Sequence, residues 1–234
     1  MNLRILKTVY VETARRLPTP ADDGTVRYSG NSYKIDLIAE GPVHPEYGWV
    51  VDYTDLKALF EPIRKQLDHQ CLDDIPELRD SHEPREIEAW INSSLQPWPS
   101  WFAGVKVSFA VSPGFHPRRL PPDPRHELPA RLAFTFFAAQ SLPQLPEEHP
   151  CRKLHGHSYQ VEIAAREDDE LERIARLLFD RFDNRYLNNQ PGLEQATSER
   201  IAARVWKTML EEGLTPLCVV IQETPSNRCH YFGG

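Results

Sequence analysis

The sequence has few cysteines, no long apolar run and no excess of basic residues, and each absence excludes a class of protein. Four cysteines in 234 residues are too few for a disulfide scaffold, so we expect them to be reduced. No run of about 18 apolar residues exists to form a transmembrane helix, and the N-terminus lacks the apolar stretch of a signal peptide. A formal net charge of −7 argues against a general nucleic-acid binder. The sequence therefore predicts a cytoplasmic protein with no membrane or nucleic-acid partner.

Proline, by contrast, is abundant, and a proline cluster marks a joint near the middle of the chain. Five of the 21 prolines lie between Ser112 and Pro124. Such a segment forms neither a helix nor a central strand. We therefore expect two domains, 1–115 and 131–234, separated by a proline-rich joint at 116–130.

The two halves of the chain resemble each other in sequence. Residues 30–37 match residues 156–163, 126 positions later, and both segments alternate apolar and polar residues as half-buried strands do. Farther along, residues 67–72 match residues 182–187, 115 positions later. One deletion of 11 residues in the second half explains both separations. The chain is therefore predicted to be a tandem duplication.

Each half is predicted to contain two β-hairpins that form an antiparallel sheet, with two helices on one face, which makes an α+β fold. The first helix of each half has apolar residues at helical spacing. The second helix of the second half should begin at Thr197-Ser198, which are good N-cap residues. The predicted core positions of the helices are Leu56, Phe60, Ile63, Leu67, Leu171, Ile174, Leu178, Phe182, Ile201, Val205 and Met209.

The most informative cluster is His155-Gly156-His157, which comes four residues after Cys151. Alternate residues of a strand point to the same side, so both imidazoles can face one metal ion, and imidazole suits zinc. A thiolate at Cys151, close to a metal ion, would be a base or a nucleophile. The alternatives are two ordinary surface histidines and a small buried apolar cysteine.

Two further carboxylates are candidates. Asp68 precedes His69, and a carboxylate beside an imidazole sets its tautomer and raises its pKa, although adjacent pairs of this kind are common. Glu223 alternates with Leu217, Val219 and Ile221 and should share their apolar face. A carboxylate there needs a partner, either a buried arginine or lysine or the N–H groups of a ligand.

These motifs resemble those of the 6-pyruvoyltetrahydropterin synthase / 6-carboxytetrahydropterin synthase family, whose fold is the tunnelling fold or T-fold. The resemblance covers most of both halves and implies two tandem T-fold modules. The matching segments are Phe137-Ala138-Ala139-Gln140, Cys151 with His155-Gly156-His157, and Glu223-Thr224 in the second half, and Gly48 to Tyr53 and Leu67-Asp68-His69 in the first half.

In that family one subunit supplies the zinc ligands and the cysteine, and its neighbour supplies the aspartate–histidine pair. The resemblance therefore implies that the second half holds Zn²⁺ and that the first half completes the site. The implied metal ligands are His155, His157 and Gln140. Gln140 replaces a histidine of the family pattern, and His149 is an alternative third ligand.

The remaining implied roles are catalytic for Cys151, Asp68 and His69, and substrate binding for Glu223 and Thr224. The metal positions of the first half read Arg15, Ser29 and Asn31, and its glutamate position reads Phe109. The aspartate–histidine position of the second half reads Asp183-Asn184. One complete set of catalytic groups thus remains per chain. The sequence leaves open whether Asp68-His69 meet Cys151 of the same chain or of a partner.

The spacing Cys-x-x-x-His-Gly-His is typical of the 6-carboxy-5,6,7,8-tetrahydropterin synthase branch. The implied function is a lyase acting on 7,8-dihydroneopterin triphosphate in the route to queuosine and other deazapurines. The alternatives are a 6-pyruvoyltetrahydropterin synthase-like or other T-fold enzyme, or an inactive pterin-binding module. Because family subunits close into rings of modules, a two-module chain is expected to form a homodimer or homotetramer.

Overall fold

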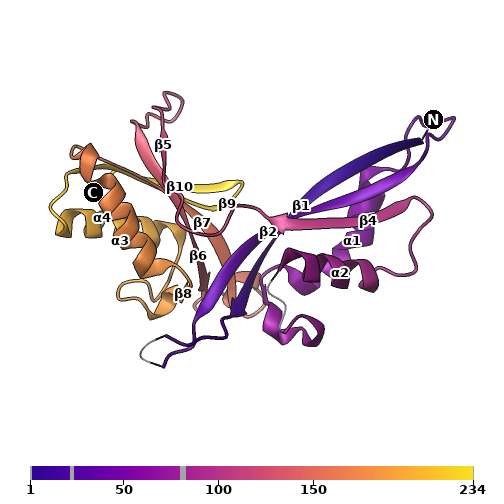
Figure 1. Ribbon diagram of the computed structural model, residues 1–234, viewed down its shortest axis with the longest axis horizontal. Coiled ribbons are helices and arrows are strands. Elements are labelled where there is room, and N and C mark those ends of the chain that lie inside the picture. Colours follow the sequence, from indigo (N-terminus) through magenta and orange to yellow (C-terminus); the bar gives the residue numbers. More distant parts are fainter. Residues whose placement is uncertain (1, 22–23, 80–82, 234) are drawn as a thin grey trace.

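The computed structural model describes residues 2–21, 24–79 and 83–233. Figure 1 shows two lobes of sheet and helix, one for each half of the chain, which meet in the middle of the molecule. The strands are β1 (Asn2–Arg16), β2 (Tyr28–Pro42), β3 (Gln70–Cys71), β4 (Phe102–Phe109), β5 (Arg118–Leu120), β6 (Arg131–Gln140), β7 (His155–Ala165), β8 (Arg185–Tyr186), β9 (Pro216–Thr224) and β10 (Asn227–Tyr231). The α-helices are α1 (Tyr53–Leu67), α2 (Pro84–Ser94), α3 (Leu171–Phe182) and α4 (Ser198–Glu211).

The first lobe is a sheet of order β3-β1-β2-β4 with α1 and α2 packed on one face. Helix α1 begins where the Asp52 side chain accepts a hydrogen bond of 2.6 Å from the backbone N–H of Thr54, which satisfies one free donor of the first turn. The four apolar residues predicted for this helix are all buried. Together with Tyr33, Ile35 and Leu37 of β2 they form the core of the lobe.

The second lobe repeats this plan with the order β10-β9-β7-β6-β5, and β8 pairs with β6. Helix α4 begins at the predicted position, with Thr197 as its N-cap. All predicted core positions of α3 and α4 are fully buried. In both lobes a two-residue strand, β3 or β8, runs parallel to the end of the first long strand. The predicted tandem α+β fold is confirmed.

The proline-rich segment contributes β5, which pairs antiparallel with β6 at the edge of the second sheet. An edge position tolerates prolines because one side of the strand needs no ladder hydrogen bonds. Among the described residues, only the second half has a complete second hairpin, which β9 and β10 form. In the first half, the chain runs from β4 to β5, which belongs to the other sheet.

The two lobes touch through two glycines that occupy equivalent positions. A Cβ atom on Gly30 would lie 1.9 Å from the carbonyl oxygen of Ala138, and one on Gly156 would lie 2.3 Å from the Cα of Gly30. Beside them, the Ser32 N–H donates to Ser158 Oγ at 3.0 Å and the Ser158 N–H donates to Ser32 Oγ at 3.1 Å. This reciprocal pair shows that an approximate two-fold axis relates the halves.

None of the described helices is long and apolar enough to cross a membrane. The four cysteines are all free thiols.

Candidate functional site

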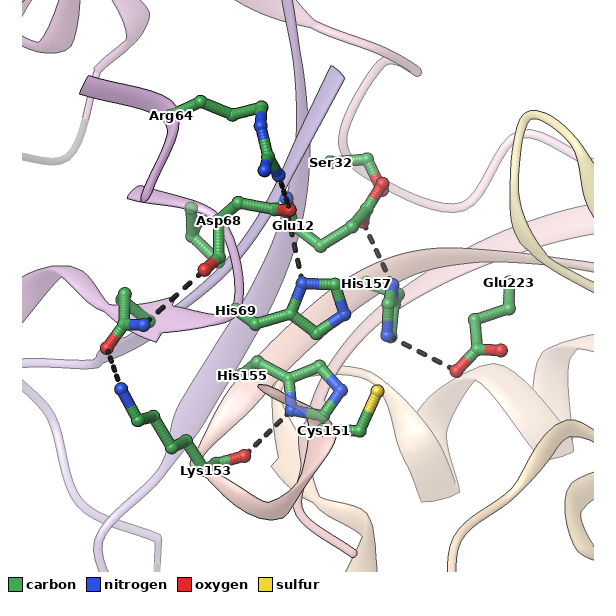
Figure 2. Close-up of polar contacts among 12 residues, drawn as sticks. Glu12, Ser32, Arg64, Asp68, His69, Cys151, Lys153, His155, His157 and Glu223 are labelled. Carbon is green, nitrogen blue, oxygen red and sulfur yellow. Dashed lines mark hydrogen bonds and ion pairs between the residues drawn. The ribbon is translucent and has the colours of Figure 1, made fainter. Parts of the chain in front are cut away.

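The candidate site lies where the lobes meet and takes side chains from both halves of the same chain (Figure 2). The metal-binding atoms of His69, Cys151 and His155 all lie within 4.8 Å of one another. The ring centres of His69 and His155 are 4.8 Å apart, and those of His155 and His157 are 5.1 Å apart. The histidine of the first half thus lies beside Cys151 of the same chain.

Both histidines of the His-Gly-His segment are oriented by a hydrogen bond at Nδ1. The Nδ1 of His155 lies 2.8 Å from the carbonyl oxygen of Lys153, and the Nδ1 of His157 lies 2.9 Å from Oε2 of Glu12. An imidazole that donates from Nδ1 has its lone pair on Nε2. Metal-binding histidines are commonly held in this way by a carbonyl or carboxylate behind them. Both rings therefore have the tautomer that a metal site requires.

Gln140 lies beside these rings because β6 pairs Gln140 with His155 at the end of the ladder. Its Nε2 donates to Glu223 Oε1 at 2.8 Å, whereas its Oε1 is buried without a hydrogen-bond partner among the described residues. Nε2 of His157 is also buried, and although it is 3.2 Å from Glu223 Oε1, the contact lacks hydrogen-bond geometry. Buried polar atoms without partners are rare and require an explanation such as an ion.

The donor set fits a zinc ion. Zinc binds imidazole nitrogen, carboxylate oxygen and thiolate sulfur, and the two buried acceptors without partners, Gln140 Oε1 and His157 Nε2, are free to bind a cation. Among the described histidines, cysteines and carboxylates, the ligand atoms of His69, Cys151 and His155 form a close group, which differs from the predicted ligands His155, His157 and Gln140. The alternative ligand His149 is exposed and accepts a hydrogen bond of 3.2 Å from the Cys151 N–H.

The Asp68-His69 pair is positioned by the end of α1. Asp68 is the C-cap of the helix, and His69 follows with φ +58°. Asp68 Oδ1 lies 3.1 Å from His69 Nδ1 and accepts the Glu12 N–H at 3.1 Å, while Arg64 donates to Oδ2 at 2.7 Å. The aspartate therefore fixes the orientation of the His69 ring.

The electrostatics of the two neighbouring histidines are opposite. Burial lowers the pKa of His69, but hydrogen bonds and charge interactions with Asp68 and Cys151 outweigh it and raise the pKa to about 10. Burial, with a smaller contribution from the charge of His157, lowers the pKa of His155 to about 3. In the metal-free protein His69 is therefore a proton donor at neutral pH, whereas His155 is neutral and available as a ligand.

Sequence reasoning missed Glu12, which is 5% exposed in β1. Its Oε2 accepts a hydrogen bond of 2.5 Å from Ser32 Oγ and contacts His157 Nδ1. Strand alternation gave no signal for it, since Val11 and Thr13 share the opposite face of β1. A buried carboxylate needs a partner, but the partner His157 lies 145 positions away in the other half, beyond the reach of local patterns.

Glu223 reaches the site, but its partners differ from those expected. It contacts His157 and Gln140 and accepts a hydrogen bond of 3.0 Å from Ser198 Oγ. No arginine or lysine among the described residues pairs with it. Val219 and Ile221 share its buried face, but Leu217 is 41% exposed. The expectation for Leu217 was wrong because the register of β9 shifts at the end of the sheet, between Ala164 and Ala165 of β7.

Thr224 lies apart from the histidine cluster. Its Oγ1 bonds within the β9–β10 turn, where it accepts from the N–H groups of Ser226 and Asn227. It also lines a cavity of about 190 Å³ at the contact between the lobes, together with Ser32 and Ser158. The structure thus brings the other predicted site residues together, whereas Thr224 lines a separate cavity.

Comparison with known proteins identifies the family. The model of the family described as "6-pyruvoyl tetrahydropterin synthase" matches residues 4–106 and 130–234, one match for each half. The chain belongs to this family. A 6-carboxy-5,6,7,8-tetrahydropterin synthase of Synechocystis is 33% identical over 117 residues, which is 42% of this chain and 88% of the relative. A putative enzyme of the same name from Archaeoglobus fulgidus is 31% identical over 102 residues, which is 39% of this chain and 84% of the relative.

Solved structures of the family are also similar to this chain. The 6-pyruvoyl tetrahydropterin synthase of Caenorhabditis elegans is 18% identical, with a TM-score of 0.38, over 46% of this chain and 89% of that chain. The enzyme of Plasmodium vivax is 12% identical, with a TM-score of 0.25, over 99% of this chain and 97% of that chain. The prediction of an enzyme, a lyase of this family, is confirmed by the family match and the named relatives.

Proposed function

We propose that this chain is a zinc-dependent 6-carboxy-5,6,7,8-tetrahydropterin synthase that acts on 7,8-dihydroneopterin triphosphate in the route to queuosine and other deazapurines. The observation that supports it best is the assembly of one site within one chain: His155, His157 and Cys151 come from the second half and His69 from the first. Independent decay of two duplicated modules would not be expected to leave complementary residues that meet in space.

His155, His157 and Gln140 would hold the Zn²⁺, and Glu12 would hold the His157 ring in place. Zinc supplies Lewis acidity, which polarises oxygen atoms of a bound substrate. Cys151, adjacent to the metal ligands, would remove a carbon-bound proton as its thiolate. His69, oriented by Asp68, would deliver or accept a proton on the substrate side chain.

Glu223 would bind the pterin head group. Its carboxylate can accept hydrogen bonds from the 2-amino group and the ring N–H, and such charge-assisted pairs are stronger than neutral ones. Gln140 and Ser198 each donate to one of its oxygens, and each oxygen has a second lone pair with which to accept from a ligand. Thr224, which lines the neighbouring cavity, would contact the substrate from there.

The test is turnover of 7,8-dihydroneopterin triphosphate by zinc-loaded protein, with products separated by chromatography. We expect 6-carboxy-5,6,7,8-tetrahydropterin and acetaldehyde from the wild type and a loss of activity of at least 100-fold in Cys151→Ala, given the usual size of acid–base contributions. The matched control is Cys229→Ala, which removes a half-buried thiol of β10 and should retain activity.

Other outcomes would select the alternatives. A 6-pyruvoyl product would identify the other branch of the family. Pterin binding without turnover would identify a binding module, a reading that the replacement of a ligand histidine by Gln140 favours. For assembly we propose a cytoplasmic homodimer or homotetramer, checked by light scattering. A mass of three chains would contradict this proposal. It would mean that the two sheets of one chain, which share no hydrogen-bonded ladder among the described strands, belong to two different rings of modules.

A further inference from the structure

The approximate two-fold axis generates a second junction between the lobes, equivalent to the candidate site. Asn184 there takes the place of His69, with φ +56° against +58°. The Asn184 N–H donates to the Phe137 carbonyl at 2.6 Å, just as the His69 N–H donates to the Glu12 carbonyl at 2.7 Å. The backbone of the site is therefore built twice, and the positive φ belongs to the fold rather than to catalysis.

The side chains of the second junction exclude the same chemistry. At a separation of 126 positions, Thr25 replaces Cys151, and Ser29 and Asn31 replace His155 and His157. These residues are neither good zinc ligands nor thiol bases. Instead, the second junction holds a cavity of about 540 Å³, lined by residues of both halves. We call it the arginine cavity, after Arg27, Arg181 and Arg185 in its lining.

Among the described residues, no carboxylate forms an ion pair with a guanidinium group of this cavity. Nε of Arg27 is buried with no hydrogen-bond partner, and Arg185 makes no hydrogen bond or ion pair with any side chain that the structure describes. Arg181 donates from Nη1 to Thr208 Oγ1 at 3.1 Å, which is a neutral acceptor. In a chain of net charge −7, three such groups around one cavity create a local positive field that net charge conceals.

Two carboxylates near the cavity, Asp180 and Asp183, already have other partners. Asp180 also lines the cavity, but it forms an ion pair with Arg176, whose Nε lies 3.0 Å from Oδ1. Asp183 lies close enough to interact with the charge of Arg27. Its Oδ1, however, accepts the Phe137 N–H at 2.9 Å and its Oδ2 accepts from the Asn184 side chain at 2.7 Å.

We propose that the arginine cavity binds a small anion with several phosphate charges, of the di- or triphosphate class. The planar guanidinium fork matches phosphate oxygens in pairs, and the amides of Asn189 and Gln190 in the same lining add neutral donors. Because the junction lacks metal ligands and a thiol, the anion is bound without being transformed. Binding here requires neither zinc nor turnover, so it goes beyond the proposed function.

The test is calorimetric titration of the full chain with inorganic triphosphate, then with pyrophosphate and orthophosphate. We expect saturable binding that weakens as the number of phosphates falls. Arg27→Ala and Arg185→Ala should each weaken triphosphate binding about tenfold or more, since a hydrogen bond to a charged group contributes about 1.5–3 kcal/mol. Arg173→Ala is the matched control: it removes an exposed arginine of α3 outside the cavity and should leave the affinity unchanged.

A second variant separates the two junctions. Lys153 is the counterpart of Arg27 at the candidate site, where its Nζ lies 3.4 Å from Gln70 Oε1. Lys153→Ala should leave triphosphate affinity unchanged. Loss of binding in Lys153→Ala, with retention in Arg27→Ala and Arg185→Ala, would place the anion at the candidate site and overturn the proposal. So would the absence of saturable binding by the wild type. Arg185→Gln keeps the packing of the stem if the alanine variant fails to fold, and should show the same loss.

Discussion

The contact between the two lobes should be broken by a single methyl group at Gly30. The Cβ of Gly30→Ala would lie 1.9 Å from the oxygen and 2.6 Å from the carbon of the Ala138 carbonyl, and 2.5 Å from the nitrogen of His157. All three are backbone atoms, so no side-chain rotation relieves the overlap. Ordinary contact begins near 3.4 Å, so β2 must move by about 1.5 Å from β6 and β7.

A shift of that size gives a measurable loss of stability. It stretches the reciprocal Ser32–Ser158 hydrogen bonds, now 3.0 and 3.1 Å, beyond hydrogen-bonding distance. Overpacking costs about 1–3 kcal/mol, and two lost hydrogen bonds add about 1 kcal/mol each. We expect the free energy of unfolding to fall by about 3–5 kcal/mol, which lowers the melting temperature by about 6–20 °C.

The assay is thermal unfolding followed by circular dichroism, together with zinc content. Gly41→Ala is the control, because a Cβ in that part of β2 meets only Val50 Cγ1, at 3.4 Å. Gly30→Ala should melt lower than this control and lose zinc, since the shift pulls Glu12 away from His157. Equal melting temperatures and equal zinc contents in the two variants would refute the close approach of the lobes.

Three further predictions concern the site. Glu12→Gln removes the carboxylate behind His157 and should weaken zinc binding about 10- to 100-fold, measured by competition with a chelator. Because we propose that Cys151 is a base, replacing zinc with Co²⁺ should give no thiolate-to-cobalt absorption band. If Cys151 were a ligand instead, a band would appear and Cys151→Ser would abolish it. In metal-free protein, burial lowers the pKa of His69, but Asp68 and Cys151 outweigh it and raise the pKa from 6.5 to about 10. Protonated His69 therefore stabilises the fold fully below pH 6.5. This contribution to the free energy of unfolding is lost as the pH rises through 10. Asp68→Asn should flatten that loss in denaturation measured between pH 6 and 10.

Each of these predictions has a clear contrary result. Unchanged zinc affinity in Glu12→Gln would show that the Glu12 carboxylate does not support a zinc ligand. The control is Glu88→Gln in α2, where Glu88 accepts hydrogen bonds from Lys106 and Val107, and it should leave zinc affinity unchanged. A cobalt band would remove Cys151 from the role of base. A wild-type stability that is flat up to pH 10 would mean that His69 is not protonated in the fold.

The fold was predictable from the sequence because it depends on local periodicity and on a repeat. Apolar spacing identified the buried faces of α1, α3 and α4, and the repeat predicted two equivalent lobes. Leu217 was misplaced because a strand irregularity breaks the alternation on which the prediction relied.

The site was predictable only in its parts. His155 and Cys151 are four positions apart in the sequence, so one turn and one strand suffice to bring their side chains together. Glu12 was missed, and the encounter of His69 with Cys151 in one chain was left open, because both depend on how the two lobes pack. That packing is set by the close approach at Gly30 and Gly156, which no single-half pattern contains.

The most direct test of the account is the zinc content of protein purified without added metal, for wild type and for His155→Ala. One asymmetric site per chain predicts about one zinc per chain in the wild type and none in the variant. Two zinc ions per chain would contradict the assignment of a metal-free second junction. No zinc in the wild type would contradict the metal-dependent function itself.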